Sequence, residues 1–201
     1  MYVKRQASLI AVLLLIALLS IFFALLTGSA AVGWHAVVDA LAGNATGNIH
    51  TLIIELRLPR ALSAFAVGGL LAIAGVLMQV LLRNPLAEPY ILGSSGGAAA
   101  GALLAIIAGL GAAMVDLAAF AGAMAATLVV FSVAHGSGSW TPARLLLTGV
   151  VLAAGFSAAT TLLLALTPDK NLRGMLFWLM GDLSFAYQPG RLLWLLAGST
   201  L

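Results

Sequence analysis

The sequence contains no cysteine and very little charge. Only 7% of its 201 residues are Asp, Glu, Lys or Arg, against roughly a quarter in an average soluble domain, while 63% are hydrophobic. The absence of cysteine excludes disulfides and thiolate metal sites. The few Lys and Arg residues are scattered, so no basic surface for nucleic acid is indicated. The composition predicts an integral membrane protein without a soluble catalytic domain.

Long apolar segments recur along the chain. A helix needs about 20 such residues to cross a hydrocarbon core of roughly 30 Å. The alternating pattern of a transmembrane barrel strand is absent, and helices satisfy their own backbone in lipid. We therefore predict an all-α, polytopic transmembrane helical bundle that forms one domain, 1–201. Five spans are expected at 9–26, 59–82, 91–110, 117–134 and 143–166, with a sixth beginning near Arg191.

The two ends of the sequence raise separate questions. Lys4 and Arg5 precede the first apolar segment and small residues follow it, as in a cleaved signal peptide, but about 18 apolar residues exceed the roughly 7–15 of such a peptide, which favours a span. At the other end, Arg191 to Leu201 would cover only about 16 Å as a helix. We expect the chain to be the N-terminal part of a longer protein, with about five and a half spans.

The placement of charges bears on the orientation in the membrane. One side of the membrane would hold Lys4, Arg5, Arg83 and Arg144, and the other Arg57, Arg60, Lys170, Arg173 and Arg191. These counts do not decide the orientation by the positive-inside rule, although the cations before the first span favour a cytoplasmic N-terminus.

Two polar segments interrupt the spans. Residues 28–57 are predicted to form a loop with a short amphipathic helix. The segment NLRGMLFWLMGDLSF, which begins at Asn171, has apolar residues at helical spacing and is predicted to be an interfacial helix.

Three blocks of sequence cover most of the chain from Arg57 onward: RLPRALSAFAVGGLLAIAGVLMQVLLRNPLAEPYILGSSGGAAAGALLA, ARLLLTGVVL and LRGMLFWLMGDLS. They resemble the permease subunits of bacterial ABC importers for iron–siderophore complexes, haem and cobalamin, the FecCD or vitamin B12 permease type.

The resemblance implies a ten-span subunit in the bacterial inner membrane. It further implies a second permease subunit, identical or different, cytoplasmic ATP-binding subunits, and an extracytoplasmic substrate-binding protein that delivers a metal chelate. On this basis the chain is not an enzyme and needs no cofactor.

The stretch RNPLAEP, residues 83–89, would be explained in part by helix ends, since prolines commonly stop one helix and start another. The resemblance further places Asn84, Pro85 and Leu86 in a cytoplasmic gate. A leucine at a constriction blocks solutes sterically and by dewetting. Thr141 and Pro142 fall on a second gate segment, where Pro142 departs from the small hydroxyl residues common in the family.

Arg57 and Arg60 are three residues apart and would share one face of a helix. They are either interfacial anchors, whose long side chains reach toward water, or docking residues. The resemblance implies docking, in which their planar guanidinium groups pair with carboxylates of the binding protein.

Small and polar residues within the spans predict helix contacts. Gly68, Gly75, Gly93, Gly97 and Gly101 would allow close packing, since small residues let helices approach in membranes. The run ILGSSGGAAAG lacks the Gly-Lys-Ser/Thr of a phosphate loop. Gln79 is predicted to bond a neighbouring helix or to line the pathway.

The substrate is predicted to be an iron–siderophore chelate, with cobalamin or haem as the alternative. No metal site is expected, because His35, His50 and His135 are far apart in sequence and iron would arrive already chelated. An ATP-independent transporter or channel would need carboxylates inside its spans, and none is present there. A non-transporting scaffold or gene remnant is a third possibility.

Overall fold

The computed structural model describes residues 2–135, 141–181 and 183, and all regular elements in these ranges are helices. The predicted all-α class is confirmed. The chain divides into two compact units, residues 1–70 with 183–201, and residues 71–182, so the helix α4 contributes to both. Four helices are long and apolar enough to cross a membrane: Arg5–Leu26, Asn48–Leu82, Ala112–His135 and Pro142–Leu166.

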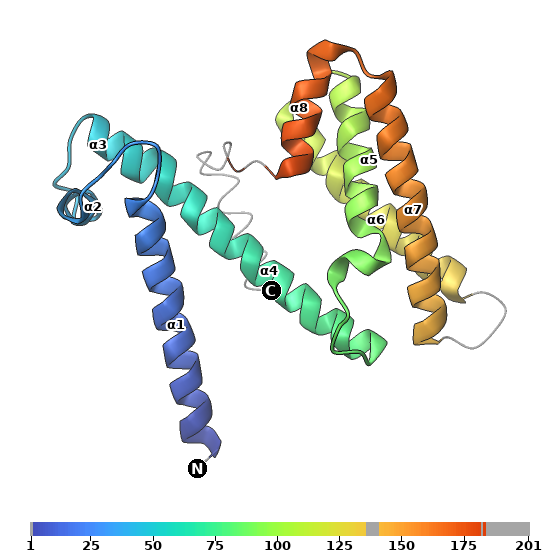
Figure 1. Cartoon of the computed structure of the whole chain (residues 1–201), viewed down its shortest axis with the longest axis horizontal. Helices are drawn as coiled ribbons and strands as arrows, with labels where there is room; N and C mark the ends of the chain where they lie inside the picture. Colours follow the sequence, from blue (N-terminus) through green and yellow to red (C-terminus); the bar gives the residue numbers. More distant parts are fainter. Residues whose placement is uncertain (1, 136–140, 182, 184–201) are drawn as a thin grey trace. The chain divides into compact units, whose positions relative to one another are not determined.

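The first unit joins α1 (Tyr2–Leu26) to the start of α4 (Leu58–Leu82) through a folded connection, as Figure 1 shows. This connection contains α2 (Trp34–Leu41), α3 (Asn48–His50) and a π-helical segment (Thr51–Arg57). Leu25, Val37, Ala40 and Ile53 form its buried apolar core. The expected short helix is present, and the polar segment as a whole is more ordered than a loop.

The second membrane helix begins earlier than predicted. It starts at Asn48 rather than Pro59, so that the proline lies inside a continuous helix. A proline there lacks an N–H and crowds the carbonyl four residues before it. The π-helical segment precedes Pro59 and shifts the bonding pattern, since Leu58 N–H donates to the carbonyl of Ile53, five residues back. The helix can therefore continue past the proline.

The second unit contains, after the end of α4, a 3₁₀ turn (Pro89–Leu92), α5 (Ser94–Ile107), α6 (Ala112–His135), α7 (Pro142–Leu166) and α8 (Asp169–Met180). In Figure 1, α5 lies among α6, α7 and α8, and it contacts all three. The expected ends of the span at 143–166 agree closely with α7, whereas α6 begins before the expected Leu117.

The third predicted span is shorter than expected. The helix α5 has 14 residues, about 21 Å, instead of extending over 91–110. Gly93 and Gly109 bound it in left-handed conformations, with φ of 69° and 70°. At its end, Gly109 N–H donates to Ile106 O and Leu110 N–H to Ala105 O, both at 3.0 Å. This pairing is a Schellman motif, which stops the helix.

The segment predicted to be an interfacial helix is helical in α8, where Met175 is fully buried, and its place at the membrane interface stays a prediction. Trp178 packs against a small-residue cluster of α5 and α6, which consists of Ala102, Ala105, Val115 and Ala119. The predicted sixth span, from Arg191, lies outside the described residues.

Candidate functional site

The C-terminal end of α4 is fixed by an arginine in an unusual conformation. Arg83 has φ of 49°, the one positive φ of a non-glycine residue in the described ranges. Its N–H donates to Val80 O at 3.3 Å, and Asn84 N–H donates to Gln79 O at 3.1 Å. These are the two bonds of a Schellman motif, in which glycine usually takes the left-handed position. The helix therefore ends directly before the predicted gate residues.

A compact turn follows at Asn84. The Asn84 side-chain oxygen accepts from Leu86 N–H at 2.9 Å, and its carbonyl accepts from Ala87 N–H at 3.1 Å. Pro85 lies between them and fixes its own φ near −65°. The asparagine and the proline thus form a turn that is held by local hydrogen bonds and a fixed φ.

The two residues at the end of this turn have opposite environments. Leu86 is 86% exposed, although it is strongly apolar, while Ala87 is 4% exposed. The loop is therefore attached through Ala87, and it presents Leu86 outward.

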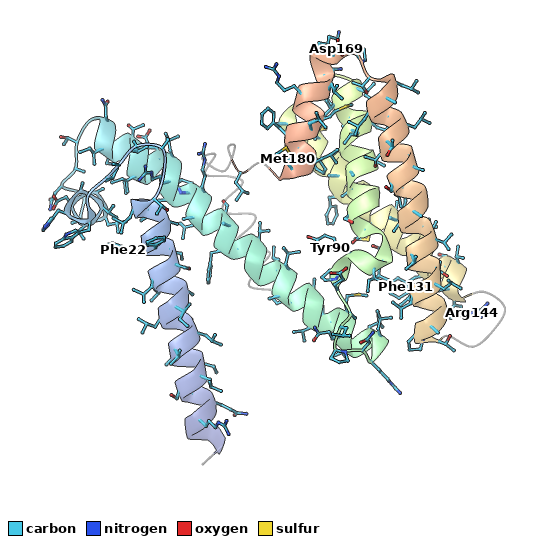
Figure 2. The ribbon with its side chains drawn as sticks, in the orientation of Figure 1. Phe22, Tyr90, Phe131, Arg144, Asp169 and Met180 are labelled. Atoms are coloured by element: carbon cyan, nitrogen blue, oxygen red, sulfur yellow. The ribbon has the colours of Figure 1, made fainter. Side chains whose placement is uncertain are left out.

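Ala87 belongs to an apolar cluster that joins the loop to two membrane helices. Its buried members are Met78, Leu82, Ala87, Leu92, Val130, Ala134 and Leu145. Phe131 of α6, labelled in Figure 2, packs against the cluster. The loop after α4 is thus packed onto α6 and α7 rather than held by its turn alone.

The 3₁₀ turn after the loop lies directly on α7. Gly149 of α7 is buried, and a Cβ at this position would overlap the carbonyl oxygen of Ile91. Gly93 follows with its left-handed φ. Close backbone approach therefore fixes the chain directly after the predicted gate segment.

The second predicted gate segment begins α7. Thr141 is the N-cap residue, and its hydroxyl oxygen accepts from Arg144 N–H at 3.3 Å. Pro142 occupies the first helical turn, where the missing N–H leaves no bond unmade. Leu145, one turn later, is in the same cluster as Ala87. The structure thus connects the two predicted gate segments through a shared apolar core, and a gating role for either stays a prediction.

The two predicted docking arginines have different environments. The Arg57 guanidinium donates to three backbone carbonyls that follow or end α1, Leu25 at 2.7 Å, Leu26 at 3.4 Å and Ala30 at 2.6 Å. Arg60 is exposed and forms no hydrogen bond or ion pair with the described residues. Sequence reasoning missed the contact of Arg57 with α1, because nothing in a sequence reports a pairing across about 30 residues.

The predicted packing glycines also separate into groups. At Gly97 and Gly101 of α5, a Cβ would overlap the carbonyl oxygens of Gly122 and Ala118 of α6. At Gly68 and Gly75 of α4, nothing in the structure lies within 4 Å of such a Cβ. The predicted packing role of the α4 glycines therefore stays a prediction.

Gln79 is exposed on α4, and its side chain forms no hydrogen bond within the part of the chain that the structure describes. Its contact with a neighbouring helix or the pathway stays a prediction. In the same described ranges, no three His, Cys, Asp or Glu residues come together as metal ligands.

A family model, described as the FecCD transport family, matches residues 14–201, nearly the whole chain. The chain belongs to the FecCD transport family. The match includes the loop after α4 and all helices of the second unit, and the four long apolar helices make this member a multi-pass membrane protein.

Similar proteins of this family come from several bacteria. The ferric enterobactin transport system permease of Escherichia coli is 40% identical over 85% of this chain and 52% of its own length. A vitamin B12 import system permease of Serratia proteamaculans is 42% identical over 63% of the chain and 38% of its own length. The chain thus spans about half the length of the curated relatives it matches.

A solved structure shares the fold. A metal-chelate type ABC transporter in an inward-facing conformation superposes with a TM-score of 0.73 and 28% identity, over 94% of this chain and 56% of that chain.

Proposed function

We propose that this FecCD chain is part of a permease subunit of an ABC importer that moves an iron–siderophore chelate across the bacterial inner membrane. ATP hydrolysis occurs in separate cytoplasmic subunits, and the permease converts it into alternating access around a central pathway. A second permease subunit, identical or different, completes the pathway, and an extracytoplasmic binding protein delivers the chelate. The relative that carries ferric enterobactin in its name supports this substrate class.

The observation that carries the proposal is the exposed Leu86 on a locked turn at the end of a membrane helix. Non-helical backbone at such a boundary is tolerated where it lines a cavity or is covered by protein. A leucine held outward at this place forms a steric and dewetting barrier across a pathway. Asn84 and Pro85 hold the turn, while Thr141 and Pro142 begin the neighbouring helix on the same core.

The scarcity of carboxylates in the membrane helices supports coupling to ATP rather than to ions. The segments 59–82, 117–134 and 143–166 contain no Asp or Glu, and Glu55 and Asp116 lie near the starts of the helices that begin at Asn48 and Ala112. A secondary transporter uses such groups to bind its coupling ion. The pathway is instead apolar, as suits a bulky chelate.

The N-terminus is cytoplasmic in this proposal. The loop at 83–89 then faces the cytoplasm, and the turn that carries Arg57 and Arg60 lies on the opposite side, where the binding protein docks. Arginine suits docking because its guanidinium binds a carboxylate with two hydrogen bonds.

The substrate is tested with the full-length protein, reconstituted in vesicles with its ATPase subunits and binding protein. We expect ATP-dependent uptake of a ferric siderophore and none of cyanocobalamin. Since one relative is a vitamin B12 import permease, uptake of cobalamin instead would show that cobalamin, and not a ferric siderophore, is the substrate. Uptake of either compound without ATP would contradict the ABC mechanism.

The gate is tested by the change Leu86→Ala in the same vesicles. We expect a several-fold faster leak of preloaded chelate in the absence of ATP, because the truncated side chain narrows the pathway less. Leu166→Ala is the matched control, since Leu166 at the end of α7 is also strongly exposed, at 74%. A Leu86→Ala variant as tight as this control would show that Leu86 forms no barrier.

A further inference from the structure

We infer that Arg57 and Arg60 have different roles. Arg57 binds the end of α1 and thereby positions the helical turn that contains Arg60, and Arg60 is the cation available to an acidic partner. The docking half of this inference rests on the proposed function, whereas the role of Arg57 does not.

The carbonyls at the end of α1 form an acceptor site for a guanidinium. The last carbonyls of a helix have no partner within the helix and carry its partial negative charge. Arg57 reaches two of them, Leu25 O at 2.7 Å and Leu26 O at 3.4 Å, and also Ala30 O at 2.6 Å beyond the helix. One side chain thus binds both the end of α1 and the start of the connection to α2.

Gly28 leaves the space that the guanidinium occupies. Its φ is 159°, and a Cβ built on it would collide with the Nη2 and Cζ atoms of Arg57. A larger residue at this position would displace the arginine from the carbonyls. The missing side chain of Gly28 therefore provides the space for Arg57, although the two residues are far apart along the chain.

The apolar core beneath Arg57 shows what this contact orders. Leu25 of α1 and Ile53 of the π-helical segment are buried together with Val37 and Ala40 of α2. Arg57 follows Ile53 by about one turn, and it donates to the carbonyl of Leu25, a member of this core. The cap therefore fixes the position of α1 relative to the helical turn that carries Arg60, within the same unit.

Releasing Arg57 to bind a partner would have a direct cost. Three carbonyl oxygens would lose their donor, and the bonds to Leu25 and Leu26 are partly buried. A partly buried acceptor that loses its donor costs free energy unless water replaces the bond. Arg60 has no such commitment, because it is exposed and bonded to none of the described residues.

The nearest carboxylate in sequence does not neutralise Arg60. Glu55 lies 3.7 Å from His50 Nδ1, and both side chains are largely exposed. The guanidinium of Arg60 thus has no partner among the described residues, and its planar shape suits a carboxylate of another protein, which it would bind with two hydrogen bonds.

The role of Arg57 is tested without any partner, by labelling the detergent-solubilised chain with an arginine-specific dicarbonyl and measuring each site by mass spectrometry. We expect Arg57 to react about tenfold more slowly than Arg60, because it must first leave its carbonyls. Gly28→Ala should raise the rate at Arg57 and leave Arg60 unchanged. Gly33→Ala is the matched control, since nothing lies within 4 Å of a Cβ at Gly33. Equal rates at the two arginines in the unmodified chain would overturn the assignment.

The role of Arg60 is tested with the full-length permease and the purified substrate-binding protein of the same transport system. We expect Arg60→Gln to weaken binding about tenfold and to flatten its dependence on salt, because one exposed charge pair is lost. Arg57→Gln should lower the unfolding temperature and keep the salt dependence of the unmodified protein. A loss of salt dependence in Arg57→Gln equal to that in Arg60→Gln would overturn the division of tasks.

A third outcome separates this inference from the proposed function. If Arg57 is protected from labelling but Arg60→Gln and Arg60→Glu both bind as before, the docking proposal fails and the cap by Arg57 stands.

Discussion

The helix α4 and the pair α5–α6 use glycine in opposite ways. In the pair, Gly97, Gly101 and Gly122 lie where a methyl group would collide with the backbone of the other helix. At Gly68 and Gly75 of α4, no atom of the described residues lies within 4 Å of an added Cβ, while Arg83, directly after α4, occupies a left-handed position that usually takes glycine. Glycine content alone therefore does not show which helices are in close contact. The neighbouring backbone decides whether a missing side chain is required.

The largest effect is expected at the contact of α5 with α6. Gly101→Ala would push a methyl group against the Ala118 carbonyl, and Gly97→Ala would do the same at Gly122. Since both carbonyls belong to the backbone and not to a flexible side chain, we expect each change to lower the free energy of unfolding by about 1–3 kcal/mol. Thermal unfolding in detergent measures it.

Gly155→Ala on α7 is the control for these two variants, because no atom lies within 4 Å of its added Cβ. If the three variants unfold at the same temperature, the α5–α6 contact is looser than described.

An intermediate effect of opposite sign is expected at Arg83. Arg83→Gly removes the cost of a side chain in the left-handed conformation and should stabilise the end of α4 by about 1 kcal/mol. Arg83→Ala loses the same charge but keeps a Cβ, so it should leave stability nearly unchanged. Hydrogen exchange of the amides of Arg83 and Asn84, which make the two closing bonds, measures the difference. Equal protection in both variants would show that the backbone there is not strained.

The smallest effect is expected at Gly75. In this chain alone, Gly75→Ala should stabilise α4 by about 0.5–1 kcal/mol, because alanine loses less backbone entropy in a helix. If Gly75 packs against a partner helix in the assembled permease, the same change lowers stability there. The unfolding temperature of Gly75→Ala is measured for the chain alone and for the assembled permease. A stabilising effect in the assembly as well would place Gly75 toward lipid.

Local features of the fold were predictable from the sequence. Apolar length identified four long helices, and RNPLAEP correctly ended α4 at Leu82. Proline and asparagine act on neighbouring backbone, so their effect can be anticipated without a structure. The start of α7 after Thr141 is predictable for the same reason.

Features that depend on distant contacts or on competing local signals were missed. Pro59 suggested a helix start, but the π-helical segment before it carries the helix through. Arg57 was expected to anchor the helix at the interface or to dock a partner, yet its guanidinium donates to carbonyls at the end of α1 and just beyond it. The distinction between Gly75 and Gly101 likewise depends on which backbone lies opposite, and a sequence does not contain that distance.

The π-helical segment also determines how far the second membrane helix reaches. With 35 residues, from Asn48 to Leu82, this helix has a contour length of about 52 Å, whereas the hydrocarbon core is roughly 30 Å thick. Even a tilt of about 40° leaves roughly 40 Å along the membrane normal. A part of the helix must therefore stand above the lipid tails. The polar residues His50 and Glu55 lie near the start of the helix and suit this part. The end of α1, which Arg57 binds, would then also lie outside the hydrocarbon core, where it is accessible from water.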